Sequence, residues 1–108
     1  MKGDRLGEFE EFTLLAVRAL GDHTYAVPVQ RYVEDATGRN VSIGAVYAAL
    51  ARLEAKSFLR SSMGDATARR GGKSKRLYAV TPLGLKTARE LHRVRDRIWH
   101  AIAEGKQS

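Results

Sequence analysis

Residues 42–62 read SIGAVYAALARLEAKSFLRSS, and within this stretch the hydrophobic period changes from that of a helix to that of a strand. Ser42 is a residue type that caps helices well, so a helix is predicted from Ile43 to about Lys56. After Ser57, β-favouring residues predict a strand over Phe58–Ser62. The apolar residues spaced three or four apart predict one buried face of the helix, made of Val46, Ala49, Leu50 and Leu53.

Two helices are predicted before this stretch. Apolar residues at helical spacing run from Glu8 to Leu20, and Gly21 favours a helix end there. A second helix is predicted to begin near Thr24 or Tyr25 and to end at Thr37. The expected apolar sides are Phe9, Phe12, Leu15, Ala16, Ala19 and Leu20 in the first helix, and Tyr25, Val29, Tyr32, Val33 and Ala36 in the second.

A second strand and a last helix follow. The strand is predicted over Arg76–Val80, and it forms a hairpin with the first strand around a tip at Ser61–Lys75. Thr81 and Pro82 are typical of an N-cap and a first helical residue, so a helix is predicted from there to about Ala103. The order of three helices, two strands and a helix matches a winged helix-turn-helix, a mainly α fold of the α+β class with a small β-hairpin. An unrelated small α+β domain is the alternative interpretation.

The composition indicates a polyanionic partner. The chain has 108 residues, which suits one compact domain, and a formal net charge of +7. This surplus of Lys and Arg attracts nucleic acid first and anionic membrane second. The absence of cysteine excludes disulfides and thiolate zinc sites. No apolar run approaches the length of a membrane span, and acidic residues interrupt positions 1–10, so we expect a cytoplasmic protein without a membrane partner.

No catalytic chemistry is evident in the sequence. His23, His92 and His100 do not have the spacing of a metal-binding set. The order of residues typical of a Ser-His-Asp triad, a paired-carboxylate pocket or a phosphate loop is not found either. We therefore expect no enzymatic activity, no cofactor and no metal site.

The outer face of the helix over Ile43–Lys56 predicts contacts with double-stranded DNA. It combines small residues, which let a helix approach a groove closely, with Tyr47 and Arg52, which can bind phosphate. The alternatives are that Tyr47 packs on the preceding helix and that Arg52 is a solvated charge. The predicted DNA-contacting residues of this element are Ser42, Gly44, Tyr47, Ala48 and Arg52.

The tip of the predicted hairpin is the strongest local signal of DNA binding. Basic residues lie there among Gly64, Gly71 and Gly72, and Asp65 is the only acidic residue. Glycine lets the backbone follow a groove while the cations meet phosphates or a narrow minor groove. A solvated loop is the alternative. The predicted contacts are Arg69, Arg70, Lys73, Lys75 and Arg76.

The sequence resembles the PadR-like transcription regulators. VYAALARLEAK at residues 46–56 is similar to that family's recognition helix, and GGKSKRLYAVT at residues 71–81 is similar to its wing and second strand. Leu83 and Gly84 continue the resemblance into the last helix. The resemblance implies a dimeric winged-helix protein, usually a repressor, that binds operators of two-fold symmetry and often responds to a small molecule. It also implies that Tyr47, Lys73, Lys75 and Arg76 contact DNA.

The sequence departs from the family pattern at three places. Ala48 stands where proline is common, and Ser57 stands where glycine is common. Residues 65–70 make the hairpin tip longer than usual. The first two departures affect how the recognition helix is presented and ended, and the third changes the segment that carries the wing contacts.

The last helix carries an apolar stripe that is too long for a small three-helix body to cover. Such a stripe predicts a partner, here a second copy packing through the same helix and through the helix over Glu8–Leu20 of the other subunit. The alternative is that the stripe only closes the chain's own core. The predicted dimerisation residues are Leu85, Ala88, Leu91, Val94, Ile98 and Ile102.

Trp99, the only tryptophan, falls beside this stripe. It is a candidate for binding a small planar aromatic effector at the dimer centre, and simple packing is the alternative. The chain is thus expected to divide into a DNA-binding domain at residues 1–80 and a dimerisation helix with a short tail at residues 81–108.

Two other functions compete with a DNA-binding regulator. A winged-helix protein-interaction module would use the same fold without reading DNA, and it would not need the basic hairpin tip. General RNA binding would expose stacking aromatic residues on a sheet. Phe58 and Tyr78 flank the predicted hairpin, but both are expected in the core.

Overall fold

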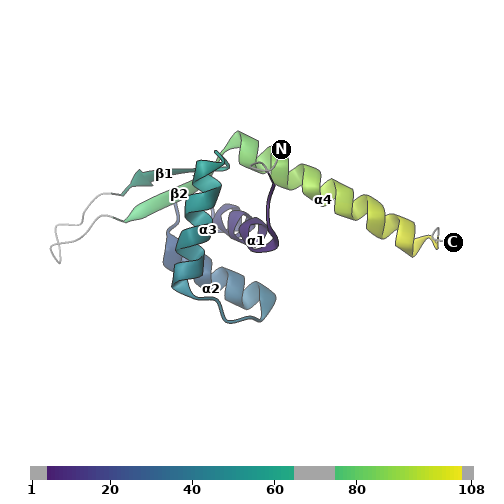
Figure 1. Cartoon of the computed structure of the whole chain (residues 1–108), viewed down its shortest axis with the longest axis horizontal. Helices are drawn as coiled ribbons and strands as arrows, with labels where there is room; N and C mark the ends of the chain where they lie inside the picture. The colour runs from purple at the N-terminus through teal and green to yellow at the C-terminus, as the bar shows by residue number, and fades with distance from the viewer. Residues whose placement is uncertain (1–4, 65–74, 106–108) are drawn as a thin grey trace.

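The computed structural model describes residues 5–64 and 75–105 and has a winged-helix architecture (Figure 1). Three helices form the body, an antiparallel hairpin extends from one side of it, and a long last helix leaves on the other side (Figure 1). The predicted fold class and order of elements are confirmed. The elements are α1 Glu8–Ala19, α2 Ala26–Thr37, α3 Ile43–Ala55, β1 Leu59–Met63, β2 Arg76–Val80 and α4 Pro82–Ala103.

Helix α3 is the centre of the body. The Ser42 side chain accepts a hydrogen bond of 3.0 Å from the Ala45 N–H and so caps the helix, as predicted. The predicted buried face is confirmed, because none of its four side chains is exposed to solvent. This face packs against both α1 and α2. It comprises Val46, Ala49, Leu50 and Leu53.

The core-facing side of α1 differs from the predicted one. Leu14 and Val17 are buried, whereas Leu15 is 44% exposed and Ala19 and Leu20 also lie at the surface. The prediction is correct for Ala16, which is buried, and for Phe9 and Phe12, which pack partly buried against the core. It is wrong for the three exposed residues, because the helix has two neighbouring apolar sides. Thr13 breaks the apolar pattern of the true core side, yet it is buried because its hydroxyl donates to the Phe9 carbonyl at 2.8 Å.

The prediction for α2 is correct for Val29 and Val33, which are buried, and wrong for Tyr32 and Ala36, which are exposed. Tyr25 is half-buried and lies at the N-cap, just before the helix. The core side is completed by Ala26, three residues before Val29 and therefore on the same face. The exposed apolar residues of α1 and α2 thus remain outside the chain's own core.

A Schellman motif ends α3 and turns the chain into β1. The Phe58 N–H donates to the Leu53 carbonyl, and the Ser57 N–H donates to the Glu54 carbonyl, both at 2.9 Å. This motif requires a left-handed residue, and Ser57 adopts a φ of 67°. Ser57 therefore stands in a conformation that glycine adopts without strain.

Helix α4 begins in direct contact with this turn. The Thr81 N–H donates to the Phe58 carbonyl at 3.0 Å, and the Thr81 side chain accepts from the Gly84 N–H. A Cβ at position 84 would lie 2.3 Å from the Phe58 carbonyl oxygen. Only glycine allows the first turn of α4 to approach this closely.

Replacing Ser57 with Gly is expected to stabilise the protein. The change removes the left-handed strain of about 1–2 kcal/mol, part of which is offset by the greater freedom of glycine in the unfolded chain. We expect a net gain of roughly 0.5–1 kcal/mol in the free energy of unfolding, measured by urea denaturation at fixed protein concentration.

Gly38→Ser is the reverse control, because it replaces a glycine in the left-handed conformation with serine. Gly38 follows α2 with a φ of 69°, and an added Cβ would meet nothing within 4 Å, so only the backbone conformation is tested. We expect this variant to be less stable by a similar amount. Equal stability of Ser57→Gly and the parent would contradict the strain at Ser57.

Candidate nucleic-acid interface

The outer face of α3 is exposed to solvent. Gly44, Ala48 and Arg52 are exposed, and Tyr47 is 55% exposed, so Tyr47 does not pack into the core beside α2. The Ser42 hydroxyl is engaged in capping the helix. The face therefore presents small side chains around one phenol, while the DNA contacts of these residues stay predictions.

Arg52 is held by an acidic residue that the sequence analysis did not connect with it. The Arg52 Nε donates to Glu10 Oε2 at 2.7 Å, and the Lys56 Nζ donates to Glu10 Oε1 at 2.6 Å. Burial raises the pKa of the Glu10 carboxyl, but the hydrogen bonds from Lys56 and Arg52 outweigh it, so this pKa lies below its usual value. Glu10 is thus ionised near neutral pH and fixes the base of the Arg52 guanidinium on α3.

The hairpin is tied to the C-terminal part of α3 by polar side chains. The Arg76 Nη1 donates to Ser61 Oγ at 3.0 Å, and that hydroxyl donates to Glu54 Oε2 at 2.5 Å. Glu54 lies in the last turn of α3, and Ser61 and Arg76 belong to the two strands. The orientation of the wing relative to the recognition helix is therefore set by this chain of bonds.

A hollow of about 280 Å³ lies between α2, α3 and β2. The Lys75 Nζ sits 4.2 Å from the centre of the Tyr25 ring, in the geometry of a cation–π contact. Buried Tyr78 also lines the hollow, and burial raises the pKa of its phenol against the opposing charge of Arg76. The lining residues are Tyr25, Ala26, Val27, Tyr47, Lys75, Arg76 and Tyr78.

The hollow brings together predicted and unpredicted residues. Tyr47, Lys75 and Arg76 were predicted as DNA contacts from two separate segments, and the structure places them around one space. Tyr25 was assigned to the core, because its apolar neighbours at helical spacing suggested a buried side. Tyr25 lies at the hollow because the backbone of the preceding residue, Thr24, pairs with that of Tyr78. This pairing is non-local and cannot be seen in the sequence.

Other predicted residues of the hairpin tip are Arg69, Arg70 and Lys73, and they lie outside the described residues. Lys75 and Arg76 are described and exposed. The Gly64 N–H donates to the Lys75 carbonyl at 2.7 Å, so the pairing of the two strands continues as far as this point.

The apolar stripe of α4 divides into two halves. Ala88 is buried in the chain's own core, and Leu85 and Leu91 are half-buried. The second half is exposed within the part of the chain that the structure describes. It consists of Val94, Ile98 and Ile102, with Trp99 beside them and 66% exposed.

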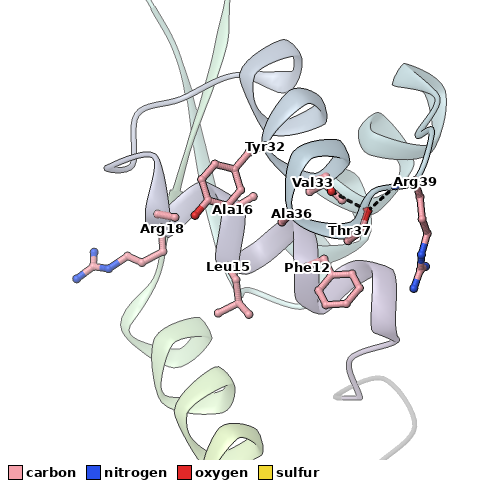
Figure 2. A pocket seen from close by; sticks show the side chains of 10 residues that line it. Phe12, Leu15, Ala16, Arg18, Tyr32, Val33, Ala36, Thr37 and Arg39 are labelled. Atoms are coloured by element: carbon pink, nitrogen blue, oxygen red, sulfur yellow. Dashed lines mark hydrogen bonds between the residues drawn. The ribbon is translucent and has the colours of Figure 1, made fainter.

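A groove of about 590 Å³ lies between α1 and α2. Figure 2 shows Phe12 and Leu15 of α1 and Tyr32 of α2 along its open side. These are residues that the sequence analysis expected in the core. Arg39 lies over the Phe12 ring at 5.9 Å and closes one end. The remaining lining residues are Ala16, Arg18, Ala19, Val33, Ala36 and Thr37.

A family model described as the transcriptional regulator PadR-like family matches residues 14–90. The chain belongs to the PadR-like family of transcriptional regulators. The match spans the body, the hairpin and the first turns of α4. No curated protein matches the chain in sequence.

PadR-like and other winged-helix structures share this fold. A PadR-like transcription factor from Bacteroides fragilis has a TM-score of 0.74 at 20% identity, covering 89% of this chain and 87% of that one. A PadR-like regulator from Bacillus cereus has a TM-score of 0.69 at 17% identity, covering 93% and 92%. F93 from STIV, a winged-helix DNA-binding protein, has a TM-score of 0.65 at 16% identity, covering 87% and 95%.

The membership settles the class of protein. PadR-like proteins are transcriptional regulators, so the expectation of a regulator rather than an enzyme is confirmed. No helix within residues 5–64 and 75–105 is long and apolar enough to cross a membrane. The same part of the chain holds no group of three or more histidine or acidic side chains that could bind a metal ion.

Proposed function

We propose that this PadR-like regulator is a homodimer that binds double-stranded DNA and represses transcription at operators of two-fold symmetry. The observation that carries the proposal is the convergence of Tyr47, Lys75 and Arg76, from the recognition helix and the wing, around one exposed hollow. F93, a winged-helix DNA-binding protein, has the same fold. The division into a DNA-binding part at residues 1–80 and a dimerisation helix at residues 81–108 belongs to this proposal.

In this proposal α3 enters the major groove. Gly44 and Ala48 leave room for the helix to approach the base edges, while Tyr47 donates from its hydroxyl to a backbone phosphate. Arg52 contributes its outer guanidinium nitrogens, since its Nε is already bonded to Glu10. The hairpin lies along the backbone beside the helix, where its cations neutralise phosphates and release counterions.

Two exposed apolar surfaces support the proposed dimer, because they lie on different parts of the chain and cannot pack against each other within one copy. The second half of α4 projects away from the body (Figure 1). The second surface is the groove between α1 and α2, whose lining side chains are drawn in Figure 2. A second copy related by a two-fold axis can place its α4 against the α1 side of the first, and the reverse. Two recognition helices then meet the same face of B-DNA about one helical turn apart, which requires a pseudo-palindromic operator.

The hairpin tip tests DNA binding. Replacing Arg69, Arg70 and Lys73 with Ala is expected to weaken binding to operator and random DNA alike. The slope of log affinity against log salt is expected to fall by about one unit for each phosphate that the variant no longer neutralises. Fluorescence anisotropy over a series of salt concentrations measures both quantities.

The matched control removes three cations from α4, with Lys86, Arg89 and Arg93 replaced by Ala. These residues share one surface of α4, so the control separates local contacts from the effect of total charge. If the parent protein binds no DNA, the chain is instead a winged-helix protein-interaction module. If the salt slope falls equally in both triple variants, the tip has no specific role.

The second half of α4 tests the dimer. Ile98→Asp places a carboxylate in the proposed interface, and Ile98 is 56% exposed in the single chain, so the variant is expected to fold. We expect a monomer in sedimentation velocity and a loss of operator affinity of at least about tenfold, because the two half-sites are no longer bound together. Arg93→Asp, on the opposite side of the helix, is expected to remain a dimer. A dimeric Ile98→Asp protein would contradict the proposal.

A planar aromatic effector is the last part of the proposal. The exposure of Trp99 next to the proposed interface supports it, since a two-fold axis would bring two such rings near the dimer centre. We expect planar aromatic dyes to quench Trp99 fluorescence and to change operator affinity, by roughly 5- to 150-fold for a typical coupling. Trp99→Ala is expected to abolish that change. Quenching without any change in operator affinity would argue against an effector role.

A further inference from the structure

The hollow between α2, α3 and β2 has the charge and chemistry of an anion site. Lys75 and Arg76 supply two cations, and Tyr47 supplies an exposed phenol hydroxyl. No acidic residue is found among the described residues that line it. The Glu54 carboxylate belongs to the hydrogen-bond network of Arg76, where it accepts from the Ser61 hydroxyl, but it does not line the hollow.

The cations of the hollow are held in place before any ligand binds. Arg76 is bonded to Ser61 through one guanidinium nitrogen, which leaves its other donors available. Lys75 has a flexible side chain and is the first described residue on the β2 side of the hairpin tip. Its ammonium nevertheless lies over the face of the Tyr25 ring, 4.2 Å from the ring centre. Fixing a lysine side chain in advance reduces the entropy that binding would otherwise cost.

The size of the hollow fits a single phosphodiester group. Its volume is about 280 Å³, and a water molecule occupies about 30 Å³ in the liquid. A phosphate with its ester oxygens and a few bound waters therefore fits. The hollow also borders the exposed face of α3, where the DNA backbone would pass in the proposed complex.

We propose that this hollow binds one phosphate of the DNA backbone, through Lys75, Arg76 and the Tyr47 hydroxyl, and that Tyr25 is a positioning residue that holds Lys75 toward it. The inference rests on the proposed DNA-binding function and deepens it. Tyr25 touches no DNA in this arrangement. It connects the N-terminus of α2 to the wing. The recognition helix and the wing then contact the same DNA strand at a fixed distance from each other.

The test is a double-mutant cycle on the full chain, with operator and random DNA measured at several salt concentrations. Lys75→Met is expected to lower the salt slope by about 0.9, the value for one phosphate. Tyr25→Leu is expected to weaken binding by about two- to fivefold, the range for a cation–π contact at an exposed site. Tyr25→Phe keeps the ring face and is expected to bind like the parent protein.

The cycle distinguishes positioning from a structural role. In the Lys75→Met background, Tyr25→Leu is expected to have no further effect, because the ring no longer has a cation to hold. Tyr47→Phe is expected to weaken operator and random DNA equally, since a phosphate carries no sequence information.

Each outcome decides between named alternatives. If the parent protein binds DNA but Lys75→Met leaves the salt slope unchanged, the phosphate site is wrong and the DNA-binding function stands. If Tyr25→Leu weakens binding equally in both backgrounds, Tyr25 acts by packing and its positioning role is wrong. A parent protein that binds no DNA at all overturns the phosphate site and the proposed function together.

Discussion

The close approach of Gly84 to the Phe58 carbonyl is the contact on which the rest of the architecture depends. It fixes where α4 leaves the body, directly at the turn that ends α3. Any side chain at position 84 would push the helix away from this turn. In a dimer built on α4, the angle between α4 and α3 determines the distance between the two recognition helices. In the proposed dimer, this single backbone contact would relate the two-fold axis to the outer face of α3.

Two adjacent acidic residues on α1 also help to fix the position of α4 relative to α3. Glu10 binds Arg52 and Lys56 of the α3 region, while Glu11 pairs with Arg95 of α4 at 2.6 Å. Both acidic residues are buried. Breaking one partner of such a pair would leave a buried charge uncompensated, which is strongly unfavourable. Helix α1 thus joins α3 to α4 through charges that each require their partner.

The elements could be predicted from the sequence because their signals are local, as with the Ser42 cap of α3. Prediction failed where tertiary packing determines which residues are buried. The side of α1 that contains Leu15 and the side that contains Leu14 are equally plausible from periodicity, and only packing against α3 selects between them. The candidate site shows the same limit. Residue types and spacing predicted the exposed face of α3 and the cations of the wing, but their meeting point depends on the pairing of Thr24 with the distant Tyr78.

The apolar residues of α1, α2 and α4 that lie outside the core are the physical basis of the proposed dimer. A chain of this size buries a limited share of its surface, and α1, α2 and α4 carry more apolar side chains than one body can cover. The excess is not scattered: it forms an outward groove on α1 and α2 and a stripe on the free half of α4. In a two-fold contact each of these surfaces occurs twice and covers the other. The same arrangement that removes apolar surface from water would also set two recognition helices at a fixed spacing, so stability and operator geometry would arise from one interface.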